Sequence, residues 1–213
     1  MNKPYAIFDM DGTLVDSMGY WRNMEREFLL SKGVTDDLEQ ILEITKPMTL
    51  EESSAYFSKT CGIDCTPQQF ISEIEAIMAL HYRQDVKIKP GVRDYLDALK
   101  QKGVPMCVAS ATAKPLVELC LETLGLKDYF RFILSCVEVG AGKNRPDVFV
   151  EAARRLGAEP KDCAVFEDAI YAVRTAHAAG FHVVAVNDGP LNAGCWDEMT
   201  SLAHEVITDW TQA

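Results

Sequence analysis

The chain has 213 residues, of which 48% are hydrophobic and 25% are charged, a composition typical of globular proteins. Its length suits one large domain or a domain with a smaller insert. The net charge of −11, from 21 basic and 32 acidic residues, disfavours binding to nucleic acid or to an anionic membrane surface. The sequence contains no run of about 18 apolar residues and no charged-then-apolar leader at Met1, so we expect a cytoplasmic protein without membrane contacts. We also expect a monomer or a weak dimer.

Seven cysteines are scattered along the chain. Most lie in apolar surroundings, as Cys107, Cys136 and Cys163 do, which predicts buried, reduced thiols in a reducing compartment. Cys61 and Cys65 are the only close pair, and no second pair or histidine tract completes a zinc site.

A predicted strand over residues 5–9 stops at two aspartates, Asp9 and Asp11, and the chain then turns at Gly12. Two ionised carboxylates this close repel each other, and burying them costs several kcal/mol unless something compensates. A hard divalent cation such as Mg²⁺ prefers such oxygen ligands, and ligands of open α/β sheets bind beyond the carboxyl ends of strands. Taken alone, the motif fits a plain Asp-Gly turn equally well.

The next comparable strand covers residues 104–109, after an amphipathic helix over 90–103 that ends at Gly103. About 95 residues separate the two strands, whereas a βαβ crossover needs about a dozen plus its helix. The excess, residues 17–86, therefore predicts an inserted unit.

The predicted insert consists of four short helices. The first runs from 18 to 31 and the second from 36 to 44, and capping boxes at 49–52 and 66–69 open the third and fourth. Two linkers, near residues 16–17 and 85–89, join this small bundle to the main body. A unit with two linkers beside a strand-end site has the organisation of a lid.

After residue 104 strands and helices alternate. The expected strands cover 104–109, 132–135, 164–166, 182–186 and 205–208, and the expected helices cover 114–124, 146–156, 169–179 and 196–204. This alternation predicts an α/β protein whose parallel sheet is covered on both faces.

Four of the predicted strands end in, or lead to, polar residues that must meet at one end of the sheet. They are Asp9 with Asp11, Ser110, Lys143 ahead of a helix, and Glu167 with Asp168. Taken singly, each has a plainer explanation as a helix cap or a solvated charge. Together they suit phosphoryl transfer, which needs a nucleophile, in-line positioning and neutralisation of charge on three equatorial oxygens.

This set of motifs, from Asp9-Met10-Asp11-Gly12-Thr13-Leu14 through Ser110 and Lys143 to Phe166-Glu167-Asp168, resembles the haloacid dehalogenase superfamily over essentially the whole chain. Order, spacing and the helical insert resemble its phosphatase and β-phosphoglucomutase branch. The resemblance implies a Rossmann-like, doubly wound parallel-sheet core (residues 1–16 and 87–213) with a small all-helical cap (17–86) inserted after the first strand.

The resemblance also implies Mg²⁺ and an aspartyl-phosphate intermediate. Asp9 is then nucleophile and metal ligand, and Asp11 is general acid/base and a metal ligand through its backbone carbonyl. Asp168 and Glu167 complete the metal site. Phosphate binds Lys143 and the segment Ser110-Ala111-Thr112. The pattern departs from the family at Asn144, where Pro is common, and at Ala169 and Ala172, where Ser and Gly are common.

The leading functional hypothesis is hydrolysis of a phosphomonoester of a small metabolite. A sugar-phosphate mutase is the alternative, disfavoured because Trp21 stands where β-phosphoglucomutases have a cap histidine. A phospho-aspartate receiver module is a remote alternative, since receivers lack a cap. A dehalogenase is disfavoured because Asp11, which protonates an alkoxide leaving group, is present.

Substrate selection is expected in the cap. The candidates are Trp21, Arg22, Lys46 and Met48. Lys46 or Arg22 would meet a second anionic group, while Trp21 and Met48 would pack on an apolar face. An equally good interpretation places the aromatic residues in the cap core and the cations in solvent.

Overall fold

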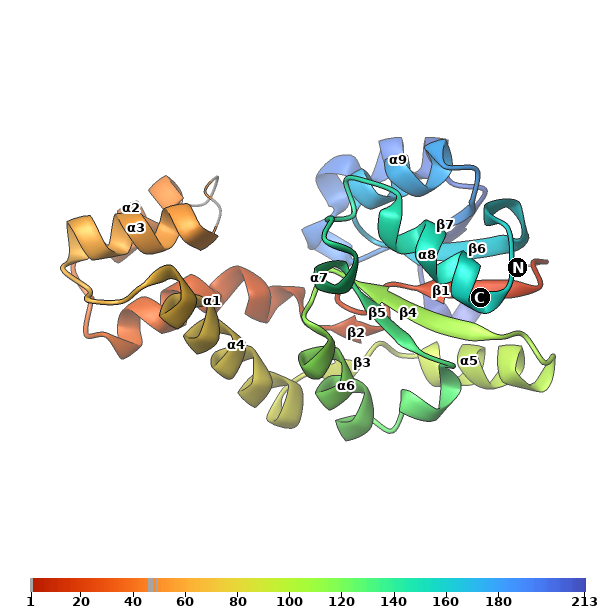
Figure 1. Cartoon of the computed structure of the whole chain (residues 1–213), viewed down its shortest axis with the longest axis horizontal. Helices are drawn as coiled ribbons and strands as arrows, with labels where there is room; N and C mark the ends of the chain where they lie inside the picture. Colours follow the sequence, from red (N-terminus) through yellow and green to blue (C-terminus); the bar gives the residue numbers. More distant parts are fainter. Residues whose placement is uncertain (1, 46–47, 49) are drawn as a thin grey trace. The chain divides into compact units, whose positions relative to one another are not determined.

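The computed structural model describes residues 2–45, 48 and 50–213. The chain divides into two compact units (Figure 1). Residues 1–18 and 86–213 form a sheet-containing unit, and residues 19–85 form a helical unit.

The first unit is built on a six-stranded parallel sheet with the order β5-β4-β1-β6-β7-β8. Its strands are β1 (Tyr5–Phe8), β4 (Met106–Ser110), β5 (Ile133–Ser135), β6 (Cys163–Glu167), β7 (His182–Val186) and β8 (Glu205–Ile207). The chain leaves β1 toward β4 and β5 on one side and later returns to β6 on the other, so the strand order reverses beside β1. A crevice beyond the carboxyl ends is expected at such a switch point.

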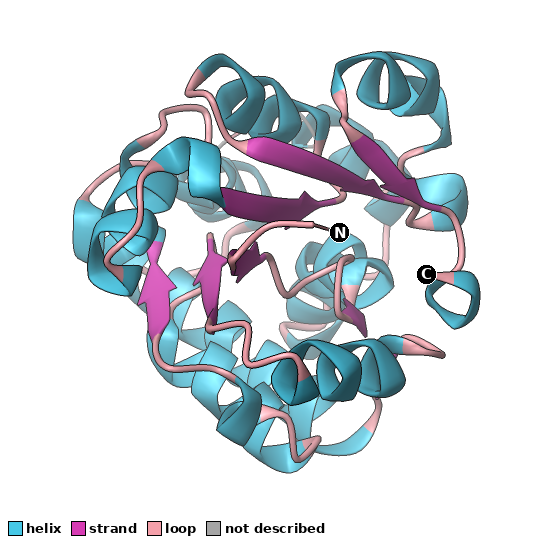
Figure 2. Cartoon of the chain, turned by 90° about the vertical axis from the view of Figure 1, so that its right-hand side faces the viewer, coloured by secondary structure: helices cyan, strands magenta, loops and turns pink. Residues whose placement is uncertain are grey.

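Helices cover both faces of this sheet, as Figure 2 shows. They are α5 (Val92–Gln101), α6 (Lys114–Thr123), α7 (Cys136–Val139), α8 (Asp147–Leu156), α9 (Ile170–Ala178) and α10 (Trp196–Leu202). Short 3₁₀ turns lie at Lys127–Tyr129, Pro160–Asp162, Gly189–Leu191, Ala193–Cys195 and Trp210–Gln212. The predicted α/β, doubly wound parallel-sheet fold is confirmed, with most element ends shifted by one or two residues.

Burial explains the apolar runs of the central strands. Every residue of β4 and β6 is buried, as expected for parallel strands covered on both faces. On one face Ile7 and Val165 join a core with α8, α9 and α10. On the other, the rings of Phe8 and Phe166 stack with centroids 4.2 Å apart.

Two short strands lie outside the main sheet, where the sequence predicted only linkers. Strand β2 (Val15–Asp16) pairs antiparallel with β3 (Lys87–Ile88), so that Val15 lies opposite Ile88. The backbone N–H of Lys89 extends the contact by donating to the carbonyl of Leu14 at 3.0 Å. The two segments that connect the units are therefore hydrogen-bonded to each other within the sheet-containing unit.

The helical unit contains α1 (Met18–Ser31), α2 (Leu38–Thr45), α3 (Leu50–Cys61) and α4 (Pro67–Gln84). Its core includes Phe28, Phe57 and Phe70, and the Phe28 and Phe70 rings meet edge to face at 4.6 Å. The predicted capping box at the start of α4 is confirmed. The predicted capping box at 49–52 lies partly outside the described residues.

None of the helices in the described part of the chain combines the length and apolar character needed to cross a membrane. The seven cysteines, all of them described, are free thiols.

Candidate active site

The carboxyl ends of β1 and β6 bring three carboxylates together. The backbone N–H of Asp9 donates to the carbonyl of Phe166 at 3.0 Å, which sets Asp9 beside the end of β6, where Glu167 and Asp168 follow. Asp9, Glu167 and Asp168 are all buried, and one carboxylate oxygen of each lies within 4.8 Å of the others. The convergence expected from parallel strand ends is therefore present in the structure.

Lys143 supplies the cation at this cluster. It precedes α8 and is only 3% exposed, and its ammonium group forms ion pairs with both Asp9 and Glu167. Burial lowers the pKa of Lys143, but the charges of Asp9 and Glu167 outweigh that effect and raise the pKa overall. Lys143 is therefore a permanent positive charge between two carboxylates.

One lysine does not balance three carboxylates. Burial raises the pKa of Asp9 well above its usual value, although the charge of Lys143 opposes the rise. Burial, followed by the charge of Glu167, raises the pKa of Asp168 to about 7. Buried carboxylates with this residual repulsion fit a divalent cation with oxygen ligands such as Mg²⁺, so the donor set and its spacing suit that ion.

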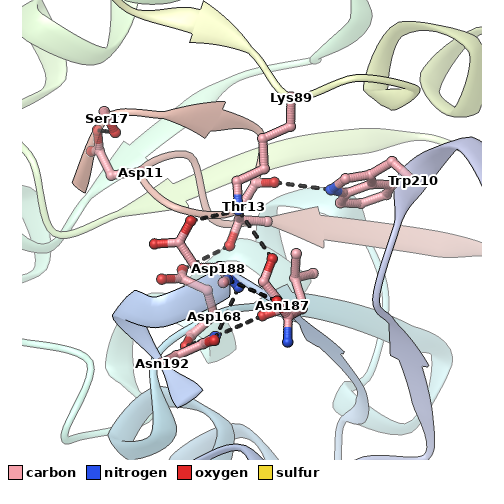
Figure 3. Close-up of polar contacts among 11 residues, drawn as sticks. Asp11, Thr13, Ser17, Lys89, Asp168, Asn187, Asp188, Asn192 and Trp210 are labelled. Atoms are coloured by element: carbon pink, nitrogen blue, oxygen red, sulfur yellow. Dashed lines mark hydrogen bonds and ion pairs between the residues drawn. The ribbon is translucent and has the colours of Figure 1, made fainter. Parts of the chain in front are cut away.

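The turn after β1 also contacts the side chain of Asp168. The N–H groups of Leu14 and Val15 donate to the carbonyl of Met10, which folds residues 10–15 into a tight loop. From this loop the Thr13 hydroxyl donates to Oδ1 of Asp168 at 2.9 Å (Figure 3). Gly12 lies against the same carboxylate with φ of +82°.

Asp11 is held by two hydroxyl groups. The Ser17 hydroxyl donates to Oδ1 of Asp11 at 2.6 Å, and the Thr112 hydroxyl donates to Oδ2 at 2.8 Å. Figure 3 shows Asp11 directed toward Ser17 and away from Asp168. The second aspartate of the motif thus lies apart from the carboxylate cluster in this structure.

The segment after β4 carries the expected phosphate donors. Ser110 is the last residue of β4 and is buried, and its hydroxyl oxygen accepts the N–H of Thr112 at 3.0 Å. The Ser135 hydroxyl donates to the carbonyl of Thr112 at 2.8 Å and so braces the turn. Ala111, which lies between Ser110 and Thr112, is exposed. Phosphate binding by Ser110, Ala111 and Thr112 stays a prediction.

Sequence reasoning gave no role to Thr13, Ser17 or Asn192, which all contact site residues. Thr13 and Ser17 belong to the first motif or its end, so their nearness to Asp9 and Asp11 was the available signal. Asn192 follows a Gly-Pro turn and donates to the carbonyl of Asp168 at 3.0 Å. Nothing in the sequence pattern marks that residue.

The candidate substrate residues lie in the helical unit. Trp21 packs against the apolar core of this unit, and its indole N–H donates to the Tyr82 hydroxyl at 3.1 Å. Arg22 is exposed and Met48 is half-buried. Lys46 lies outside the described residues. Their roles in substrate recognition stay predictions.

A buried carboxylate cluster with a lysine, at the carboxyl ends of a parallel sheet, is an arrangement suited to phosphoryl chemistry in an α/β protein. Residues 5–180 match the family model of haloacid dehalogenase-like hydrolases. The chain therefore belongs to the haloacid dehalogenase-like hydrolase family. The expectation of a phosphatase of this family is confirmed by relatives whose names state that activity. Family membership also sets aside the receiver-module alternative.

Two curated relatives illustrate the likeness. A bifunctional riboflavin kinase/FMN phosphatase of Arabidopsis thaliana is 31% identical over 186 residues, covering 87% of this chain. The chain spans only 48% of that plant protein's length. A fructose-1-phosphate phosphatase of Escherichia coli is 30% identical over 188 residues, covering 87% of this chain and 98% of the relative.

Among solved structures, a haloacid dehalogenase family hydrolase from Deinococcus radiodurans, with bound phosphate and sodium, superposes with a TM-score of 0.70. The two share 26% identity, and the match covers 99% of this chain and 93% of that chain.

Proposed function

We propose that this protein is a Mg²⁺-dependent phosphomonoesterase that acts on a small phosphorylated metabolite through an aspartyl-phosphate intermediate. The observation that carries the proposal is the cluster of Asp9, Glu167 and Asp168, with Lys143 paired to Asp9 and Glu167. Phosphoryl transfer is governed by positioning and by neutralisation of charge, and these residues supply both.

In the first step a carboxylate oxygen of Asp9 attacks phosphorus, and the ester P–O bond breaks. The leaving alkoxide takes a proton from Asp11, which gives a neutral alcohol. In the second step water attacks the phosphorus of the aspartyl phosphate and yields its proton to Asp11, and the P–O bond to Asp9 breaks. Phosphate leaves and both aspartates return to their starting states.

Asp9, Asp168, Glu167 and the backbone carbonyl of Asp11 would hold Mg²⁺. Bound there, the ion supplies positive charge to the phosphoryl oxygens. Lys143 supplies a second positive charge, because it is protonated and buried beside Asp9. The Ser110 hydroxyl and the backbone N–H groups of the following turn orient the remaining oxygens.

The hydroxyl bonds to Asp11 bear on the timing of proton transfer. Ser17 and Thr112 hold its carboxylate away from Asp168, so Asp11 must turn toward the leaving group when substrate is present.

The substrate class is proposed from chemistry and from the named relatives. Those relatives act on fructose 1-phosphate and FMN, which are small phosphorylated metabolites. Trp21, Arg22, Lys46 and Met48 remain the candidate residues for choosing among such compounds.

The test is hydrolysis of a generic aryl phosphate with and without Mg²⁺. Asp9→Asn should abolish turnover, whereas Asp16→Asn, at an exposed carboxylate of β2, should retain it. Retained turnover in Asp9→Asn would contradict the mechanism. Acid quenching during turnover of a ³²P-labelled substrate should leave label on the wild-type chain and none on Asp9→Asn.

The substrate is then sought with a panel of phosphorylated metabolites and a phosphate-release assay. A phosphatase releases phosphate from one compound class. Conversion of glucose 1-phosphate to glucose 6-phosphate by NMR, without phosphate release, would instead establish the mutase alternative.

A further inference from the structure

The loop after β7, residues 187–192, is fastened to the end of β6 by one buried amide. Asn192 is 6% exposed. Its side-chain N–H groups donate to the carbonyl of Asp168 at 3.0 Å and to the carbonyl of Val186 at 2.9 Å. Its side-chain oxygen accepts the N–H of Asp188 at 3.0 Å. Both donors and the acceptor of the amide are thus used to join two strand ends.

The same loop is fastened to the second chain connection by a buried ion pair. Lys89 directly follows β3, and its ammonium group lies 2.7 Å from Oδ1 of Asp188 and 3.2 Å from the carbonyl of Asn187. The side chains of Lys89 and Asp188 are 12% and 5% exposed. Figure 3 shows Lys89 extending to the loop that carries Asp188 and Asn192.

We propose that Asn192 is a positioning residue for Asp168, and that the Lys89–Asp188 pair holds the Asn192 loop in place against it. The inference rests on the proposed function, in which Asp168 is a metal ligand. Asn192 would act through the backbone of Asp168, because its side-chain amide donates to the Asp168 carbonyl.

The physical reason is the precision that a metal ligand needs. Asp168 is fixed at its side chain by Thr13 and at its backbone by Asn192. Mg²⁺ demands near-ideal octahedral geometry, so rotation of the Asp168 peptide would spoil the donor set even with the Thr13 bond intact. Removing outer partners of metal ligands typically lowers metal affinity by about 10–100-fold.

The ion pair extends this restraint to the chain connection. The backbone of Lys89 is bonded to Leu14, in the loop that also carries Thr13. The two groups that hold Asp168 are therefore linked through Lys89. A break at Lys89 and Asp188 should loosen the Asn192 loop while leaving every carboxylate of the cluster in the chain.

The experiment is calorimetric titration of the substrate-free protein with MgCl₂, which needs no turnover. We expect Asn192→Ala to bind Mg²⁺ about 10-fold or more weakly. The KM for an aryl phosphate at saturating Mg²⁺ should stay near that of the wild type. The matched control is Asn187→Ala. Within this turn the Asn187 side chain accepts a hydrogen bond from the N–H of Gly189. Removing the Asn187 side chain should therefore leave the Mg²⁺ affinity unchanged.

A folded Asn192→Ala variant with wild-type Mg²⁺ affinity would overturn the proposal. If that variant does not fold, Lys89→Met/Asp188→Leu decides, because replacing a buried ion pair by apolar residues is often neutral for stability. We expect this double variant to fold and to bind Mg²⁺ several-fold more weakly. Wild-type affinity in it, or loss of folding in both variants beside an intact Asn187→Ala, would assign the loop a purely structural role.

The two proposals fail separately. A wild-type protein that neither takes up Mg²⁺ nor releases phosphate would contradict the proposed function. A wild-type protein that does both, with Asn192→Ala equal to it, would contradict only the positioning role.

Discussion

Gly12 lies so close to Asp168 that a β-carbon at Gly12 would come within 2.3 Å of the Asp168 Oδ2 atom. Its φ of +82° is also one that residues with a β-carbon rarely adopt. The turn after Asp11 is therefore shaped by the carboxylate that it must accommodate, and a side chain at Gly12 would displace a proposed metal ligand.

Gly12→Ala should accordingly lower both activity and Mg²⁺ affinity by about 10-fold or more, because Asp168 must move. The strained φ should cost a further 1–2 kcal/mol or so of stability. Gly180→Ala is the matched control, since Gly180 has φ of +83° and a β-carbon there would meet nothing within 4 Å. It should share the stability loss and keep its activity. Equal activity losses in the two variants would show that backbone strain, not contact with Asp168, is responsible.

Lys143 and a Mg²⁺ ion bound as proposed would compete for the negative charge of Asp9 and Glu167. Lys143→Met leaves Asp9 and Glu167 buried without their cation, which should destabilise the Mg²⁺-free protein by about 3 kcal/mol or more. Turnover should fall by about 100-fold or more, because the proposed cationic donor to the transferring phosphoryl group is lost. Mg²⁺ should nevertheless bind more tightly and raise the unfolding temperature by more than in the wild type.

Thermal unfolding with and without MgCl₂ checks this prediction. Lys161→Met is the control, because Lys161 is 73% exposed at its side chain and precedes β6, at the opposite end of that strand from Glu167. This control should change neither the unfolding temperature of the Mg²⁺-free protein nor the rise in that temperature when Mg²⁺ is added. Weaker Mg²⁺ binding in Lys143→Met would mean that Lys143 organises the carboxylates instead of offsetting their charge.

Much of this site could be predicted from sequence because its principal residues sit at the ends of apolar runs. Ser110 and Glu167 end strands that are buried throughout, and Asp9 follows a strand of which only the first residue is partly exposed. Parallel strands carry their ends to one edge of the sheet. Local patterns of this kind are visible without knowing the fold.

The contacts that fix the site are not local and could not be predicted. Thr13 and Asp168 are 155 positions apart, and Asn192 reaches Asp168 across 24 positions. Each is a single polar residue in a loop, which pattern reasoning assigns to a turn. The β2–β3 pairing was missed for a similar reason, since two-residue strands leave no periodicity.

His81 lies between two carboxylates within the helical unit. Its two ring nitrogens lie 2.8 Å from carboxylate oxygens of Glu27 and Asp85, and its ring lies 4.4 Å from that of Tyr20. Partial burial lowers the pKa of His81, but the hydrogen bonds and charges of Asp85 and Glu27 outweigh it and raise the pKa above 6.5.

A raised pKa in the folded state means that protonated His81 stabilises the protein. The contribution is fully present below the unfolded pKa of about 6.5 and is lost as pH rises through the folded pKa. His81→Gln should cost about 1 kcal/mol or less at pH 6, because both carboxylates are partly exposed, and less still at pH 9. Urea unfolding at the two pH values measures this difference. A larger loss at pH 9 than at pH 6 for His81→Gln would contradict the assignment.

Trp210 connects the C-terminal 3₁₀ turn to the loop that carries Thr13. It is 5% exposed, and its indole N–H donates to the carbonyl of Thr13 at 3.2 Å, while its ring stacks on Phe166 with centroids 5.9 Å apart. Trp210→Phe keeps an aromatic ring in this position but removes the donor. The Thr13 carbonyl is then left buried without that bond, which costs about 1–3 kcal/mol.

We therefore expect Trp210→Phe to lower the urea midpoint by more than Trp196→Phe does. Trp196 is the matched control, because it opens α10 and is only partly buried against the core. Since the Thr13 loop holds Asp168, Mg²⁺ affinity should fall modestly in Trp210→Phe and stay unchanged in Trp196→Phe. A stability loss without any change in Mg²⁺ affinity would show that the Thr13 hydroxyl keeps its position without support from the C-terminal turn. The restraint on Asp168 would then come from within the sheet and from Asn192.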